Sequence, residues 1–97
     1  MPKAYLVVQY HAISDLEKLA AYSKLAGPAI TGAGGRFIVR GVAAEAYEGG
    51  KLQRTVVAEF PDLATAKALY ASPAYQEAIA ALGGAVERDM RIVEGVE

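Results

Sequence analysis

The sequence contains no cysteine and only 1 histidine in 97 residues. The absence of cysteine excludes disulfides, thiolate nucleophiles and cysteine metal sites, and it fits a reducing compartment, so we expect a cytoplasmic protein. A single histidine leaves zinc, copper or iron almost no ligands, because such sites usually recruit several histidines or cysteines. We therefore expect no metal and no other cofactor.

The chain also has no marked excess of positive or negative charge and no long hydrophobic run near its start. The formal net charge is -1, whereas binding to nucleic acid or to an anionic membrane relies on a strong positive field. The longest apolar run near the start, residues 4–8, is too short for the core of a signal peptide or for a membrane span. We expect a soluble, unprocessed chain that binds neither nucleic acid nor membranes.

Hydrophobic residues, in contrast, are plentiful. They make up 54% of the chain, against 22% that are charged, which is too apolar for a disordered protein. A chain of this length forms one domain, residues 1–97, and buries roughly two thirds of the surface that the unfolded chain exposes. The apolar share is slightly high for a free monomer, so part of the surface is expected to meet a partner.

The first half of the chain predicts a strand followed by a long helix. Residues 3–11 carry apolar side chains on both alternating faces, which is typical of a central strand covered on both sides. Ser14 and Glu17 have the spacing of a capping box, and a helix with one apolar stripe is expected from about residue 15. Pro28 predicts a kink or a restart of this helix, because proline lacks the amide donor. The glycines that follow end the helix.

Residues 36–40 predict a second strand, with Arg36 and Arg40 on one face and Phe37 and Val39 on the other. The arginine face is unusual for a strand that is otherwise apolar.

A hairpin follows this strand. Gly41 predicts a bulge, and residues 44–48 could continue the strand before a glycine turn. The chain then returns through residues 54–60, which are apolar on both faces apart from Glu59 and predict a second internal strand.

Two more helices and a last strand complete the chain. Asp62 is a good N-cap for one helix, and Ser72 caps a short third helix with Pro73 at its first position. Gly83 terminates this helix, and residues 87–95 form the last strand.

This order, β-α-β-β-α-β, predicts a ferredoxin-like α+β domain in which helices cover one face of a four-stranded antiparallel sheet. The other face is left bare, although its strands carry apolar residues. The same face of a second copy is the simplest cover, so we expect a homodimer.

The chain resembles the bacterial domain-of-unknown-function family 1330, within the dimeric α+β barrel superfamily. The resemblance covers nearly the whole chain and implies a dimer of ferredoxin-like protomers with a pocket between helices and sheet. Relatives in the wider superfamily include cofactor-free monooxygenases, lactone isomerases and haem-degrading enzymes, so the fold alone selects no activity. The residues that carry the resemblance are Gly34-Gly35-Arg36-Phe37, Arg40-Gly41, Glu48-Gly49, Glu59-Phe60-Pro61, Ala66-Lys67, Tyr70, Ser72-Pro73, Tyr75 and Val93-Glu94-Gly95.

Arg36 and Arg40 are the leading candidates for ligand binding. Four residues apart on one strand, they point to the same side, and their guanidinium groups could hold a carboxylate, a phosphate or an enolate oxygen. The alternative is that both arginines pair with carboxylates across the sheet or the dimer interface, Glu59 among them.

Glu59 and His11 are the candidates for acid-base catalysis. Glu59 could be a general base if the pocket buries it, or it could be the ion-pair partner that makes one arginine tolerable. His11 could face a cleft as an acid or base, and the alternative is a solvent-facing histidine at a strand end.

Tyr22 and Tyr70 come from the two main helices that should cover the sheet. Their phenol hydroxyls could orient a ligand oxygen or stabilise an oxyanion. The alternative is that they are core or interface residues bonded to backbone carbonyls.

Two functions from different classes remain open at this point. The first is a site under the helices for an anionic or carbonyl small molecule, with cofactor-free monooxygenase-like or isomerase-like chemistry possible on an enolisable substrate. The second is a non-catalytic dimeric module for ligand sensing or protein interaction. Whether the arginines point into a cavity or into carboxylates distinguishes them.

Overall fold

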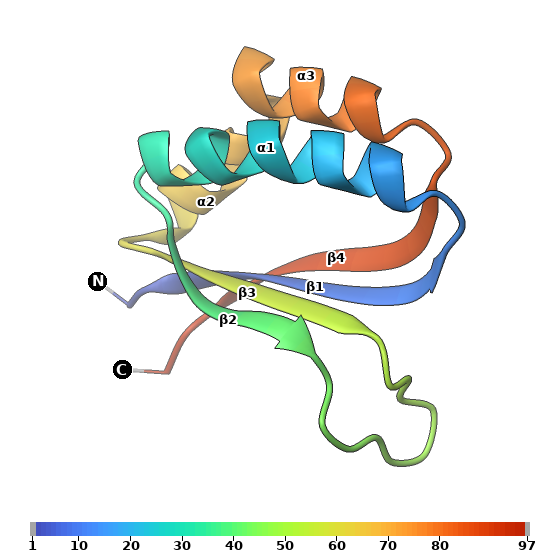
Figure 1. Ribbon diagram of the computed structural model, residues 1–97. Coiled ribbons are helices and arrows are strands. Elements are labelled where there is room, and N and C mark those ends of the chain that lie inside the picture. The colour runs from blue at the N-terminus through green and yellow to red at the C-terminus, as the bar shows by residue number, and fades with distance from the viewer. Residues whose placement is uncertain (1, 97) are drawn as a thin grey trace.

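The computed structural model describes residues 2–96, which fold into one four-stranded antiparallel sheet and three helices (Figure 1). The strand order is β2-β3-β1-β4, so the two strands expected to be internal, β1 and β3, lie at the centre. The predicted ferredoxin-like topology is confirmed, with a third helix inserted before the last strand. The elements are β1 (Ala4–Ile13), α1 (Leu16–Gly32), β2 (Arg36–Val42), β3 (Arg54–Phe60), α2 (Leu63–Ala71), α3 (Pro73–Leu82) and β4 (Val86–Glu94).

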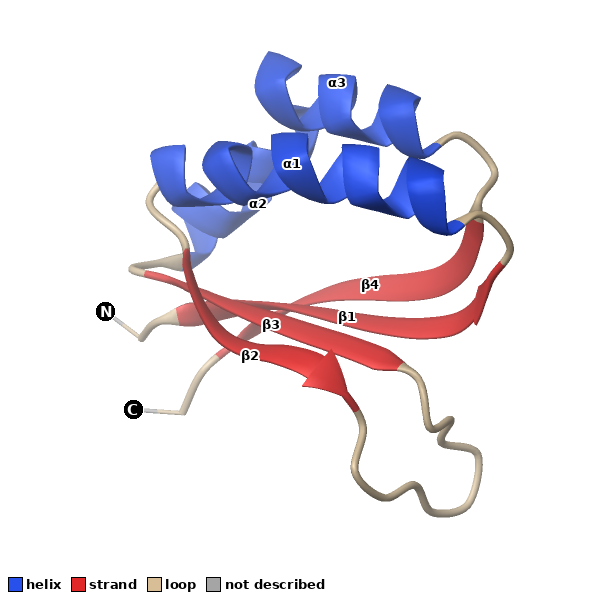
Figure 2. Cartoon of the chain, viewed as in Figure 1, coloured by secondary structure: helices blue, strands red, loops and turns tan. Residues whose placement is uncertain are grey.

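All three helices lie on the same face of the sheet (Figure 2). The molecule is therefore two layers thick, and its shortest extent is 16 Å. On β1, every second side chain points toward the helices, so that Leu6, Val8 and Tyr10 are buried while Gln9 and His11 are exposed. The core lies between helices and sheet, and no segment of residues 2–96 covers the outer face of the sheet.

Asp15, rather than Ser14, caps α1. The Asp15 carboxylate accepts hydrogen bonds from the backbone amides of Glu17 and Lys18 at 3.0 and 3.1 Å. The Ser14 hydroxyl instead donates to the carbonyl of Ala85 at 2.9 Å, which ties the start of α1 to the start of β4. The predicted capping box was wrong because this contact between distant segments takes the serine away from the helix end.

Helix α1 runs through Pro28 without a restart. Pro28 has no backbone N–H, so the carbonyl of Lys24, four residues earlier, receives no hydrogen bond within the helix. Both residues lie on the exposed side of the helix. Water can donate to that carbonyl there, so the missing bond need not interrupt the helix.

The bulge in β2 lies at Ile38, not at Gly41, and residues 44–48 form no strand. Arg36 pairs with Glu59 on β3, whereas Arg40 pairs with Val56 after the register shift. Val56 is buried under the helices and Glu59 faces outward. Because a bulge adds one residue to one strand, it reverses the alternation of faces beyond it. The two arginines therefore lie on opposite faces, and the expectation that they share one was wrong.

The remaining helix ends match the sequence patterns. Asp62 caps α2 by accepting from the Thr65 amide at 2.7 Å, and Ser72 caps α3 by accepting from the Tyr75 amide at 3.3 Å. Gly83 follows α3 with a φ of 57°, a left-handed conformation that glycine adopts readily. No helix in residues 2–96 is both long and apolar enough to cross a membrane.

A candidate anion-binding cavity beneath the first helix

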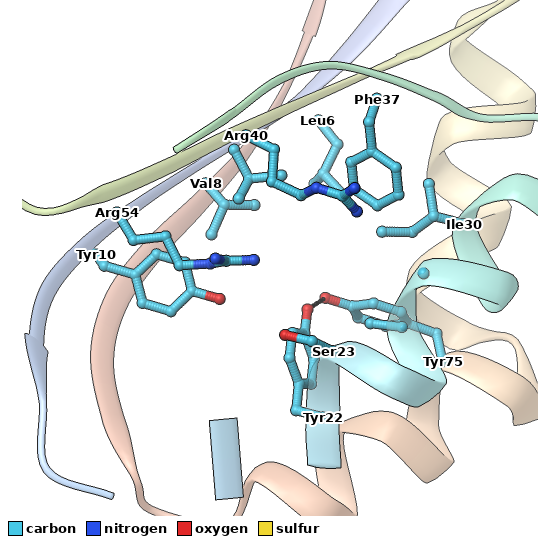
Figure 3. A pocket seen from close by; sticks show the side chains of 13 residues that line it. Leu6, Val8, Tyr10, Tyr22, Ser23, Ile30, Phe37, Arg40, Arg54 and Tyr75 are labelled. Carbon is cyan, nitrogen blue, oxygen red and sulfur yellow. Dashed lines mark hydrogen bonds between the residues drawn. The ribbon is translucent and has the colours of Figure 1, made fainter. Parts of the chain in front are cut away.

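A cavity lies between α1 and the inner face of the sheet (Figure 3). It encloses about 30 Å³, and since a buried water needs at least about 10–15 Å³ of such space, the enclosed part has room for about two waters or for the head group of a ligand. Its walls are Leu6, Val8, Tyr10, Tyr22, Ser23, Ala26, Gly27, Ile30, Phe37, Arg40, Arg54, Val56 and Tyr75.

Two arginines from neighbouring strands extend into this cavity. Arg40 of β2 lies with its guanidinium carbon 4.6 Å from the centre of the Phe37 ring. Arg54 of β3 lies 5.8 Å from the centre of the Tyr10 ring, and its Nε is buried without a hydrogen-bond partner. Both cations thus rest near aromatic rings, which attract the face of a guanidinium group.

A third arginine, Arg88 of β4, approaches the same aromatic side chains from the other side of β1. Its Nη1 donates to the Tyr10 hydroxyl at 3.0 Å, and its guanidinium carbon lies 4.7 Å from the centre of the Tyr22 ring. Arg88 therefore adds positive charge behind the phenols that line the cavity.

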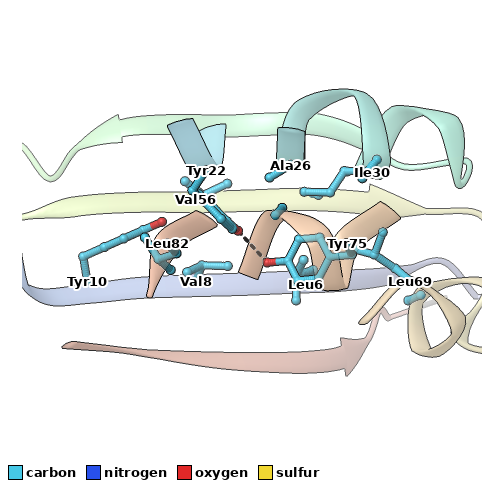
Figure 4. Close-up of a cluster of buried hydrophobic side chains, with 14 of the residues drawn as sticks. Leu6, Val8, Tyr10, Tyr22, Ala26, Ile30, Val56, Leu69, Tyr75 and Leu82 are labelled. Carbon is cyan, nitrogen blue, oxygen red and sulfur yellow. Dashed lines mark hydrogen bonds between the residues drawn. The ribbon is translucent and has the colours of Figure 1, made fainter. Parts of the chain in front are cut away.

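Tyr22 of α1 and Tyr75 of α3 join their hydroxyls across the cavity wall at 2.5 Å (Figure 4). Burial raises the pKa of Tyr75, and the nearby Tyr22 raises it further. The phenol therefore stays protonated at physiological pH and can take part in hydrogen bonds as a neutral group.

Among residues 2–96, no acidic side chain lines the cavity. The ion pairs among residues 2–96 involve the basic groups of Lys3, His11, Arg36 and Arg91, and none involves the three arginines near the cavity. A concave site with converging guanidinium groups and no carboxylate has the electrostatic character of an anion-binding site.

Of the residues predicted from the sequence, Arg40 and Tyr22 line the cavity, while Arg36 and Glu59 lie on the opposite face of the sheet. Glu59 accepts from Lys3 at 3.2 Å and from Arg36 at 3.1 Å, and the Tyr5 hydroxyl lies at 3.5 Å. The Lys3 hydrogen bond, and then the Arg36 contact, lower the pKa of Glu59. An ion-paired carboxylate outside the cavity is poorly suited to be its general base.

Tyr70 and His11 lie elsewhere, beside an open groove between α3 and β4. Tyr70 is 47% exposed, and its ring centre lies 5.6 Å from that of Tyr75. His11 is exposed and bonded to Asp89 at 2.8 Å. The structure does not bring either residue together with Arg40.

The sequence reasoning missed Arg54, Arg88 and the placement of Tyr10. The position of Tyr10 could have been predicted, because alternate residues of a strand share a face and Tyr10 follows Leu6 and Val8 in that alternation. The two arginines had no local signal, since their position depends on how β3 and β4 pair with their neighbours. Residues 2–96 hold no cluster of three or more side chains suited to a metal ion.

Fold and cavity together define the class: a ferredoxin-like α+β domain with a positively charged cavity beneath its helices. The chain belongs to the DUF1330 family, described as a domain of unknown function, whose model matches residues 3–96. A search of curated proteins finds no match.

Several solved structures share the fold. RPA0582, a protein of unknown function from Rhodopseudomonas palustris, is 17% identical with a TM-score of 0.75, over 99% of this chain and 84% of that one. A dimeric ferredoxin-like protein of unknown function from Jannaschia sp. CCS1 is 14% identical with a TM-score of 0.72, over 96% and 99%. SnoaB, a cofactor-independent oxygenase from Streptomyces nogalater, is 14% identical with a TM-score of 0.63, over 100% and 96%. At such identities the likeness concerns the fold alone.

Proposed function

We propose that this protein binds a small anionic or carbonyl compound in the cavity beneath α1. The observation that carries the proposal is the pair of arginines, Arg40 and Arg54, which reach into a largely apolar cavity without a carboxylate partner. Tyr22 supplies a phenol hydroxyl at the same wall. Small-molecule sites typically combine apolar walls with a few converging polar groups, as this cavity does.

Binding without turnover is the favoured form of this function. In the part of the chain that the structure describes, no carboxylate and no imidazole lines the cavity, so proton abstraction from a substrate has no ordinary base there. Cofactor-free oxygenation or isomerisation is the second candidate. It is supported by the likeness to SnoaB and by guanidinium groups that would stabilise an enolate.

A thermal-shift screen of carboxylates, phosphates and neutral carbonyl compounds tests the binding proposal. Compounds that raise the melting temperature of the wild type should lose most of that effect with Arg40→Gln and keep it with Arg36→Gln, a matched arginine on the outer face. Equal responses of the two variants would contradict a site at this cavity. Oxygen uptake and substrate loss, measured with each hit, separate turnover from binding.

We also propose that two copies pair through the outer face of the sheet. Val39 and Val93 are 46% and 51% exposed there, and solved neighbours from Jannaschia sp. CCS1 and Thermobifida fusca are described as dimeric. Burial of such side chains is the usual driving force for association. Cytoplasmic localisation stays a prediction from the sequence.

A further inference from the structure

The two arginines of the cavity are close neighbours of like charge. Arg40 pairs with Val56 and Arg54 pairs with Val42, so the arginines occupy diagonal positions on adjacent strands, on one face. Such positions are about 7–8 Å apart, and long side chains reach across this distance. Figure 3 shows both guanidinium groups directed into the same space. Without a carboxylate nearby, the pair carries repulsion that a bound anion would relieve.

The aromatic contacts leave the hydrogen-bonding edges of these arginines available. Phe37 attracts Arg40 and Tyr10 attracts Arg54 through their rings, an interaction that uses none of the N–H hydrogen bonds of the guanidinium group. The N–H donors lie in that plane and match the two oxygens of a carboxylate.

Tyr10 adds a hydrogen-bond donor beside the arginines. The Tyr10 oxygen already accepts a hydrogen bond from Arg88, so the Tyr10 proton remains for another acceptor. The Tyr75 hydroxyl donates to Sδ of Met90 at 3.9 Å, so Tyr22 donates to Tyr75 and this pair leaves no phenol proton for a ligand. A site in which donors far outnumber acceptors favours a ligand that carries acceptors on adjacent atoms.

From this arrangement we infer that the cavity binds small 2-oxo acids. The carboxylate bridges Arg40 and Arg54, and the neighbouring carbonyl oxygen accepts from the phenol of Tyr10. The enclosed volume of about 30 Å³ has room for the two carboxylate oxygens in place of about two waters, and the remainder of the ligand extends toward the open side of the cavity. The inference rests on the proposed function and narrows its ligand class.

Calorimetric titration with pyruvate, acetate and lactate tests the inference, since only pyruvate has a 2-oxo group beside its carboxylate. Pyruvate should bind at least tenfold more tightly than acetate and more tightly than lactate. Arg54→Gln and Arg40→Gln should each weaken pyruvate binding at least tenfold, while Arg36→Gln leaves it unchanged. Because each cavity variant relieves repulsion, its melting temperature without ligand should equal or exceed that of the wild type.

Four outcomes would overturn the inference. Acetate binding as tightly as pyruvate removes the role of the 2-oxo group. If Arg54→Gln lowers the melting temperature and leaves the affinity for pyruvate unchanged, Arg54 stabilises the fold and does not bind the ligand. Absence of pyruvate binding, with a phosphate or neutral carbonyl compound located in the cavity by crystallography, refutes the 2-oxo acid and leaves the proposed function standing. Absence of every screened class from the cavity refutes both.

Discussion

Gly35 lies at the tightest point between α1, β2 and the core. A Cβ built on it would lie 2.7 Å from Cγ2 of Ile30 and 2.8 Å from Cζ of Phe60, distances that real Cβ atoms do not adopt. Gly32, three residues earlier at the end of α1, would place its Cβ in open space. The two glycines have different physical roles although they belong to the same glycine-rich stretch.

Alanine substitutions should separate these roles. Gly32→Ala should stabilise the fold by about 0.5–1 kcal/mol, because alanine loses less backbone freedom than glycine in a helix. Gly35→Ala should destabilise it by about 1–3 kcal/mol, because the methyl group overpacks the site. Urea unfolding followed by circular dichroism measures both values. Equal effects of the two substitutions would contradict the tight packing at Gly35.

At the scale of single elements, local patterns predicted most of the fold. The caps Asp62 and Ser72, the glycine after α3 and the internal positions of β1 and β3 depend on neighbouring residues or on periodicity, and the structure has them as expected. The cap of α1 was mispredicted because Ser14 bonds to a residue far away in the sequence. Contacts of that kind have no local signature.

The candidate site was harder to predict for the same reason. Whether Arg40 faces the helices depends on the bulge at Ile38, which forms through pairing with β3. Arg54 and Arg88 reach the aromatic cluster from separate strands. The sequence analysis assumed that side chains alternate regularly through residues 36–40, which leaves no place for the extra residue of a bulge. It therefore predicted Arg36 and Arg40 on the same face.

Deletion of Ile38 tests this description of β2. Without the extra residue, β2 alternates regularly, with Arg36 on the outer face and Arg40 on the inner face. The fold should therefore persist, and so should the contact in which the guanidinium carbon of Arg40 lies 4.6 Å from the centre of the Phe37 ring. Nuclear Overhauser effects between these two side chains measure the contact. Deletion of Val57, in an unbulged part of central β3, is the control and should prevent folding, because it shifts the side chains beyond it to the opposite face.

An Ile38 deletion variant in which Arg40 contacts Glu59 instead would show that the bulge does not set the face of this arginine.

At the scale of the whole molecule, the two-layer architecture leaves one sheet face uncovered. The chain exposes 5995 Å², somewhat more than the roughly 5,300 Å² typical of a monomer of this size. The outer face combines Val7, Val57 and Val39, which pair across β1, β3 and β2, with charged groups toward the ends of the strands, among them the Lys3–Glu59–Arg36 cluster. An apolar centre with a polar rim is the usual anatomy of a protein interface.

One substitution on each side of the molecule tests whether this face is the interface. The wild type should sediment as a dimer, and Val39→Asp should sediment as a monomer, because a carboxylate buried in an apolar interface without a partner is costly. Leu16→Asp, at a 74% exposed position on α1, introduces the same charge on the helical side and should leave the dimer intact. Analytical ultracentrifugation over a range of concentrations measures both. A monomeric wild type would refute association through this face. A Val39→Asp variant that remains dimeric would place the interface on another surface of the molecule.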